Sequence, residues 1–342
     1  MTELEETIEF KEIESEESRE EEEKQNTLII ILRWIFKNIK FLFVPGSRLE
    51  ELSKREFDYE KTISKRKFIR RLKSFLTLVG IIIIFVVITF AIFGQWIAPY
   101  SFESQTMGMF LGSYEPPSPE HLLGTTSLGR DVLSRIIYGA RASLVIAFPA
   151  VGFSVIVGIL LGTMAGYFGS WLDLILMRIM DVLLSFPGLI LALVFVAIIG
   201  QRIEAFMFAF GIIGVPSYAR LIRASVLQAK ELPYVQAAKV VGANNRRIMF
   251  KHIIPNVINP IIISVTFDIG SVILNLAGLA FLGFTDPGLI DWGKEIWISM
   301  ARLFDAPWAV FWPGLMILIT VLGFMLLGDG LRDALDPRLR NI

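Results

Sequence analysis

Few polar side chains that could do chemistry interrupt the apolar runs of this sequence, and most lie close together. Asp173, Arg178 and Asp181 fall in one such run and are followed by Ser185. Arg178 and Asp181 are three residues apart, so on a helix they share one face and can neutralise each other. Charges within a membrane are costly and usually face the interior of a helix bundle. These residues suggest a polar pathway or gate, with pairing to a neighbouring helix or to lipid headgroups as the simpler alternative.

Histidine and cysteine are too scarce here for a metal site or thiol chemistry. The chain has two histidines, His121 and His252, and no cysteine. The one Gly-Lys pair is followed by Glu295, so no stretch matches the phosphate-binding pattern G-x-x-x-x-G-K-[ST]. No nucleophile and base stand together in a recognisable set. We therefore predict no catalytic residue, no metal and no cofactor in this chain.

The composition indicates a polytopic membrane protein. Of 342 residues, 54% are hydrophobic even without counting glycine, and the mean hydropathy is +0.60. A soluble domain has about 45 to 50% apolar residues with glycine included. The net charge of zero averages over segments of opposite charge, so it says nothing about partners.

The apolar runs predict an all-α fold with six transmembrane helices in a domain over 75–330. A helix needs about 20 apolar residues to cross a bilayer. The expected spans are approximately 75–97, 143–166, 174–199, 205–221, 257–282 and 311–327.

Basic residues predict the orientation of these spans. The segment before the first span is rich in Lys and Arg, and so is the loop 222–256. Cytoplasmic loops carry this excess of positive charge, so both are expected inside the cell. Six crossings then leave the loops 98–142 and 283–310 outside and the tail 331–342 inside. Both termini are therefore predicted to be cytoplasmic.

The residues before the first span divide into three segments. The first is too acidic and too poor in apolar residues to fold, so we predict a disordered tail. In the second, Arg33, Lys37 and Lys40 share one helical face. Burying each in hydrocarbon costs about 2.5 to 3.5 kcal/mol, which favours an amphipathic helix on the membrane surface over a crossing helix. The segments are the acidic tail 1–26, the interfacial helix 27–46 and the basic segment 47–74.

Small residues recur every four positions in the second span. Such a stripe allows another helix to approach closely. The residues of this stripe are Ser154, Gly158, Gly162 and Gly166.

The basic loop between the fourth and fifth spans predicts a pair of short helices. The first is expected over 232–241, with Gly242 as the residue that reverses the chain. The second is expected over 245–254 and ends at Pro255. A helix lying flat on the membrane is the alternative, but the glycine stop and the second helix favour docking to a partner protein.

This loop resembles that of inner-membrane permease subunits in ATP-binding-cassette importers. Their signature is E-A-A-x-x-x-G-A followed by an apolar-x-apolar-Pro sequence, and here the stretches read QAAKVVGA and HIIPN. Three further stretches resemble the oligopeptide, dipeptide and nickel branch, and in particular its second, C-type permease: LGTTSLGRDVLSRIIYGARASL, YARLIRASVLQAKELPYVQAA and LGDGLRDALDPRLR. The resemblance covers about residues 121–340 and implies the type I permease fold.

The resemblance assigns an ATPase-coupling role to the loop. Gln236 departs from the usual Glu, so an ion pair with the ATPase would be lost or replaced by a neutral hydrogen bond. His252 has no nearby acid in the loop and is expected to play a structural role. The implied coupling residues are Tyr234, Gln236, Ala237, Ala238, Gly242, Ala243, His252, Pro255 and Asn256.

The resemblance also implies the partners and the cargo. It implies a homologous second permease subunit, two cytoplasmic ATPases that carry ATP and Mg²⁺, and an extracellular solute-binding protein, all at the cell membrane. Nucleic acid is not expected. The implied cargo is a peptide, with oligosaccharide or nickel as alternatives. An ion-coupled secondary transporter would place isolated acids in mid-span, whereas we expect the acids of the apolar runs to cluster near one end of the third span.

Overall fold

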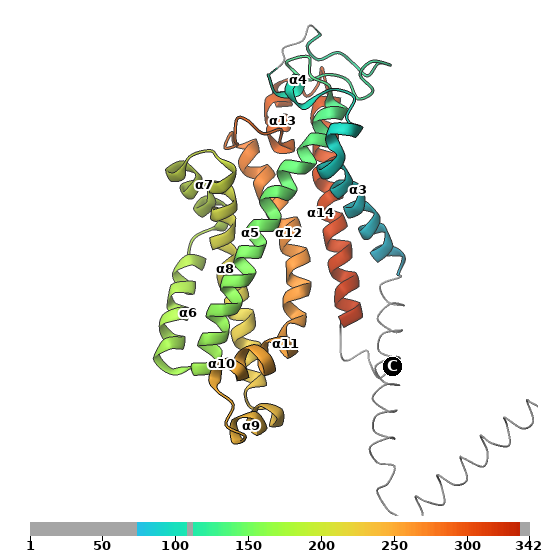
Figure 1. The fold of residues 1–342 in the computed structure, drawn as a ribbon. Coiled ribbons are helices and arrows are strands. Elements are labelled where there is room, and N and C mark those ends of the chain that lie inside the picture. Colours follow the sequence, from blue (N-terminus) through green and yellow to red (C-terminus); the bar gives the residue numbers. More distant parts are fainter. Residues whose placement is uncertain (1–73, 108–111, 336–342) are drawn as a thin grey trace, which may run out of the picture. The chain divides into compact units, whose positions relative to one another are not determined.

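The computed structural model describes residues 74–107 and 112–335, and Figure 1 shows their arrangement. The acidic tail 1–26, the interfacial helix 27–46 and nearly all of the basic segment 47–74 lie outside the described residues. Within the described residues the fold is helical, and the only strand-like pairing is an isolated bridge between Thr125 and Asp131. The helices are α3 (Phe75–Ile97), α4 (Phe102–Met107), α5 (Val132–Phe168), α6 (Ser170–Leu184), α7 (Gly188–Ile199), α8 (Ile203–Ala229), α9 (Pro233–Val240), α10 (Asn245–Arg247), the π-helix η1 (Ile248–Ile253), α11 (Ile254–Val257), α12 (Asn259–Phe281), α13 (Trp292–Ser299), the 3₁₀ turn η2 (Met300–Arg302) and α14 (Trp308–Leu335).

Five of these helices are long and apolar enough to cross a membrane: α3, α5, α8, α12 and α14. The pair α6 and α7 provides a sixth crossing if the two are counted together. The predicted all-α fold is therefore confirmed. The short helices α4 and α13 lie at one end of the bundle, here called the α13 end, and α9 lies at the other, here called the α9 end (Figure 1).

The third expected span, 174–199, is not one helix. Helices α6 and α7 meet at an angle of 87° across a break at Ser185, Phe186 and Pro187. Proline has no amide hydrogen, and its ring disfavours helical geometry in the residue before it. Pro187 therefore stops α6 and caps the start of α7.

Helices α5, α8 and α14 are longer than their expected spans, whereas α3 coincides with its expected span and α12 is slightly shorter. Helix α5 begins at Val132 rather than near 143, and α8 continues to Ala229 rather than ending near 221. Asp131 caps α5 by accepting a hydrogen bond from the Ser134 amide at 2.7 Å. Polar residues at the ends of these helices lower the hydropathy without interrupting the backbone. Parts of the predicted loops 98–142 and 222–256 are therefore helical.

Helices α5 and α8 approach each other along the stripe of small residues. A Cβ atom added to Gly158 would lie 2.4 Å from the Cβ of Tyr218. One added to Gly162 would lie 2.3 Å from the carbonyl oxygen of Ala219. These distances are too short for any side chain, so glycine is required for this contact. The stripe also places the Ser154 hydroxyl 2.6 Å from the carbonyl oxygen of Gly211.

A buried ion pair holds the α13 end together. The Arg135 guanidinium on α5 donates to the Glu295 carboxylate on α13, and both side chains are almost fully buried. The same guanidinium also donates to the backbone carbonyl of Gln105 on α4. A buried pair of this kind is strongly destabilising when one partner is removed, because the other charge is left uncompensated. Three elements that are distant in sequence therefore depend on one arginine.

A second buried carboxylate, Asp291, caps α13. It accepts hydrogen bonds from the amides of Gly293 and Lys294 at 2.8 and 3.2 Å. Burial raises the pKa of Asp291 to about 6, although these two hydrogen bonds oppose the rise, and the nearby Glu295 charge adds to it. The carboxylate is therefore held at a site that prefers the neutral acid.

Replacing Gly162 with alanine should destabilise the α5 and α8 contact, since the new methyl group would collide with the α8 backbone. We expect a loss of about 1 to 3 kcal/mol, typical of overpacking. The matched control is Gly152→Ala on the same helix, where an added Cβ has no atom within 4 Å. Thermal unfolding of the detergent-solubilised protein measures both, and equal midpoints for the two variants would contradict the assigned contact.

Stability should depend on pH through Asp291. Its pKa in the folded state is raised above the unfolded value of about 3.9. Its stabilising contribution is therefore complete below pH 4 and is lost as the pH rises through about 6. The shift of about two units corresponds to a loss on the order of 3 kcal/mol.

The Asp291→Asn variant tests this effect because asparagine also caps helices well and has no charge. We expect it to be more stable than the native chain at pH 7.5 and to show a flatter pH profile of unfolding between pH 4 and 7. Identical profiles for the two proteins would show that the carboxylate is not destabilised by burial.

Candidate docking loop and polar path between helices α8 and α12

Helix α9 is anchored on one face and exposed on the other. Pro233 occupies its first turn, where the missing amide hydrogen is not needed. Val235 is fully buried and Ala238 packs against the same hydrophobic core. At the far end, Val240 and Val241 are each 87% exposed. An apolar tip held on a buried anchor is suited to insertion into another protein.

The reversal after α9 is a Schellman motif at Gly242. The Ala243 amide donates to the carbonyl of Ala238 at 3.0 Å, and the Gly242 amide donates to that of Lys239 at 2.9 Å. Gly242 has φ +80°, and a Cβ there would meet no atom within 4 Å. Glycine is therefore needed for its backbone conformation and not for space.

Gln236 makes a hydrogen bond within the chain. Its side-chain amide donates to the carbonyl oxygen of Lys230, at the end of α8, at 3.0 Å. A carboxylate at this position could only accept, so the usual Glu would not make this bond. The neutral side chain ties α9 to α8. Ala237, the next residue of the signature, is exposed on α9.

The second half of the loop is tied to α5 and bends around Pro255. The Tyr167 hydroxyl on α5 donates to the Asn245 side chain at 2.9 Å. Asn256 donates from its side chain to the carbonyl of His252 at 2.7 Å, so His252 takes part through its backbone. Pro255 cannot donate to the preceding turn, and the π-helix η1 accommodates this loss just before it.

The predicted gate residues form ion pairs with arginines of α8. Asp173 binds Arg223 through both carboxylate oxygens, at 2.5 and 2.6 Å. Asp181 lies 2.5 Å from Arg220, whereas Arg178, its expected partner, is farther away at 3.9 Å. These pairs join α6 to α8 near the α9 end. Ser185 donates its hydroxyl to the carbonyl of Val182 at 2.6 Å, at the break before α7.

One acid that the sequence patterns did not single out, Asp268, lies in the middle of α12. The expected clustering of acids in the third span is therefore wrong. The signal was present as a polar stripe with spacings of four, three and four residues, which share one helical face. The stripe consists of Ser264, Asp268, Ser271 and Asn275. Isolated between long apolar runs, these residues were obscured by the high hydropathy around them.

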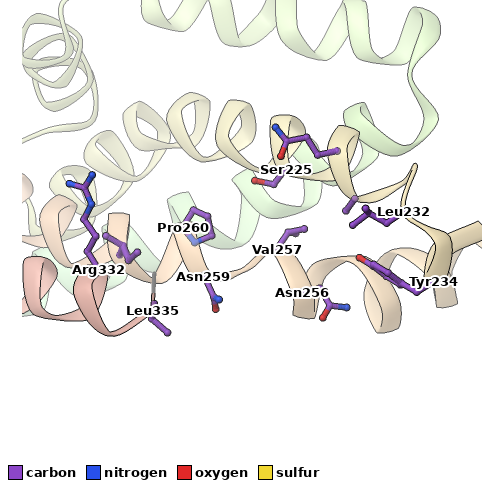
Figure 2. Close-up of a pocket in the computed structure, with 12 residues that line it drawn as sticks. Ser225, Leu232, Tyr234, Asn256, Val257, Asn259, Pro260, Arg332 and Leu335 are labelled. Atoms are coloured by element: carbon purple, nitrogen blue, oxygen red, sulfur yellow. The ribbon is translucent and has the colours of Figure 1, made fainter. Parts of the chain in front are cut away.

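Two cavities lie along α8 and α12. The larger has a volume of about 530 Å³ at the α9 end, and its lining includes Tyr234 and Asn256 of the loop, Asn259 of α12 and Arg332 of α14 (Figure 2). The smaller has a volume of about 170 Å³ in mid-span. It is lined by Ser217, Tyr218, Leu221, Ser264, Phe267 and Asp268. Among the described residues no group of three acids or histidines is arranged to hold a metal ion.

Two families match this chain. The family described as the binding-protein-dependent transport system inner membrane component matches residues 158–341. The N-terminal transmembrane domain of oligopeptide transport permease C matches residues 66–117.

Known proteins are similar over most of the chain. The dipeptide transport system permease protein DppC of Alkalihalophilus pseudofirmus is 42% identical over 79% of this chain and 88% of its own length. The glutathione transport system permease protein GsiD of Pectobacterium atrosepticum is 39% identical over 81% of this chain and 92% of its own length. A chain of the methionine transporter MetNI, solved in inward-facing conformations, matches with a TM-score of 0.48 at 17% identity over 59% of this chain and 97% of that chain.

The matched residues include α9, the Schellman turn and the polar stripe of α12. The first family covers more than half of the chain, and the two relatives match 79% and 81% of it. This chain belongs to the family of binding-protein-dependent transport system inner membrane components, as a multi-pass permease.

Proposed function

We propose that this chain is one permease subunit of an ATP-driven importer and forms half of the path for a peptide. The observation that carries the proposal is α9, whose tip is exposed while Val235 and Gln236 fix it to the spanning helices. The relatives named for dipeptide and glutathione transport support a peptide as cargo.

The proposed assembly has a second, homologous permease subunit beside this chain. Two cytoplasmic ATPases would carry ATP and Mg²⁺, so hydrolysis takes place outside this chain. An extracellular solute-binding protein would deliver the cargo to the α13 end. The basic loop 222–256 supports placing the α9 end and both termini in the cytoplasm, at the cell membrane.

In this assembly α9 converts movement of an ATPase into movement of helices. Its exposed valine tip would sit in a cleft of the ATPase. Closure of the two ATPases on ATP supplies the energy difference between inward-open and outward-open states. Displacement of α9 then reaches α8 through Gln236 and α5 through Tyr167. The chain itself makes and breaks no covalent bond.

The polar stripe of α12 supports a path on this side of the chain. Asn275 is exposed on the surface of the described bundle, and Ser264, Asp268 and Ser271 are partly exposed. Polar side chains in a spanning helix are costly against lipid and face a bundle interior or a water-filled cavity. In the assembly this face would therefore look toward the path or the second permease.

The proposed function is tested by uptake into liposomes that contain the complete complex. A labelled tripeptide should accumulate only with ATP and the solute-binding protein, and accumulation should persist when ionophores collapse the proton and sodium gradients. Asp268 is the feature that would suit an ion-coupled transporter. Uptake that stops with ionophores but continues without ATP would replace the proposal with that alternative.

Gly242 allows a test of the coupling role. Proline requires φ near −65°, whereas Gly242 has φ +80°, so Gly242→Pro should disrupt the turn. We expect uptake to fall at least about tenfold while membrane insertion and assembly persist. Asparagine tolerates a left-handed conformation, so Gly242→Asn should retain most of the uptake. Normal transport by the proline variant would remove the docking role from this turn.

A further inference from the structure

The mid-span cavity contains a carboxylate without a cationic partner in the described residues. Asp268 lies about 14 Å along the axis from the start of α12 and about 20 Å from its end, at 1.5 Å per residue. It is therefore deep in a hydrocarbon core about 30 Å thick. Two other acids of the apolar helices, Asp173 and Asp181, each pair with an arginine. An unpaired acid at this depth is costly and usually functional.

Tyr218 faces the same cavity with an unused hydrogen-bonding group. Its side chain is only 2% exposed, and its hydroxyl has no hydrogen-bond partner among the described residues. The hydroxyl lies against the Asp268 carboxylate, close enough for both charge and hydrogen-bond interaction, although outside strict hydrogen-bond geometry. Gly158 on α5 creates the space for the Tyr218 Cβ. The position of this buried tyrosine is thus set by the helix contact and leaves its oxygen directed at the cavity.

The chemistry of the lining selects a small cation that donates hydrogen bonds. A carboxylate, a phenol and the hydroxyls of Ser217 and Ser264 provide acceptor oxygens. Since a water molecule takes up about 30 Å³, a cavity of about 170 Å³ holds a terminal group and a few attached atoms but not a whole peptide. A primary ammonium group matches both the charge and the size.

The cavity also lies next to a route from the α9 end. The larger cavity is lined by Ser225 and Gln228, one to two turns beyond Leu221 of α8, and by Ile263, which is next to Ser264 of α12. On the other side, Ser271 and Asn275 continue the stripe toward the α13 end. A cargo that moves along this face would therefore pass Asp268.

We propose that Asp268 and Tyr218 form a subsite that receives the ammonium group of the cargo as it crosses the membrane. This inference rests on the proposed function, which supplies the peptide as cargo. The carboxylate supplies the opposing charge, and the buried hydroxyl and the two serines orient the group. The subsite would lower the cost of moving a charged amine through the centre of the bilayer.

The first test measures the electrostatic preference of the cavity and needs no transport. Because the native chain has no cysteine, Ser264→Cys places one reactive thiol in the cavity of this chain. In the assembled complex, a cationic trimethylammonium-ethyl methanethiosulfonate should modify it at least about tenfold faster than the anionic sulfonatoethyl reagent. Adding Asp268→Asn should bring this ratio close to that of Ser225→Cys, the control in the larger cavity. Modification is read on this chain by mass spectrometry, and a ratio that Asp268→Asn does not change would overturn the subsite.

The second test uses uptake by the complex. Uptake of a tripeptide is compared with uptake of its des-amino analogue, in the native and in the variant complex. Because both complexes use the same solute-binding protein, its preference for one peptide cancels in this comparison. Asp268→Asn should slow tripeptide uptake about tenfold, as expected for loss of a charge-assisted hydrogen bond, and analogue uptake less than about twofold. Tyr218→Phe should act in the same direction with a smaller effect. The control Asp329→Asn removes an acid of α14 that lines neither cavity.

The two tests separate the inference from the proposed function. Equal slowing of both peptides would mean that Asp268 has a structural role, and no slowing of either would mean that the amine does not bind there. A des-amino peptide with a lysine side chain distinguishes the α-ammonium from a side-chain ammonium as the bound group. If the complex transports no peptide at all, the proposed function fails while the labelling ratio still tests the cation preference of the cavity.

Discussion

The close contact between α5 and α8 determines where the functional groups of this chain stand. Gly158, Gly162 and Gly166 leave no room for a Cβ atom, because the α8 backbone or its Cβ atoms occupy that space. With α8 held this close, its arginines reach the acids of α6, and Lys230 donates to the carbonyl of Gly166 at the end of α5. The same contact fixes Tyr218 at the mid-span cavity. A single larger side chain in the stripe would therefore displace groups in the middle and at the C-terminal end of α8.

The pairing of charged side chains differs between the ends of the bundle and its middle. At the α13 end Arg135 and Glu295 are buried together, and near the α9 end Asp173 and Arg223 form a bidentate pair. Paired charges with fixed geometry hold elements in place. In mid-span Asp268 has no cation beside it among the described residues and opens on a cavity. The paired charges thus suit a structural role, and the unpaired one suits an incoming group.

The all-α fold could be predicted from the sequence, because the thickness of the bilayer, and not tertiary contacts, requires apolar runs of about 20 residues. The sequence was not sufficient to predict the break before Pro187, since proline is tolerated inside other helices of this chain, such as Pro149 in α5 and Pro216 in α8. The candidate coupling residues could be named from local signatures, but their contacts could not. Gln236 is the clearest case: its type suggested a lost ion pair, whereas its bond to α8 depends on how the chain turns after Ala229.

The docking loop is connected to both helices that line the cavities. Gln236 ties α9 to the end of α8, while α10, η1 and α11 lead from the Schellman turn into α12. Tyr167 holds the second half of the loop against α5, which itself cannot move far from α8 without breaking the glycine contact. A displacement of α9 is therefore expected to shift α12 relative to α5 and α8 more than it shifts α5 relative to α8. Since residues of both α8 and α12 line each cavity, the proposed docking of the loop would act on the proposed path where its polar groups lie.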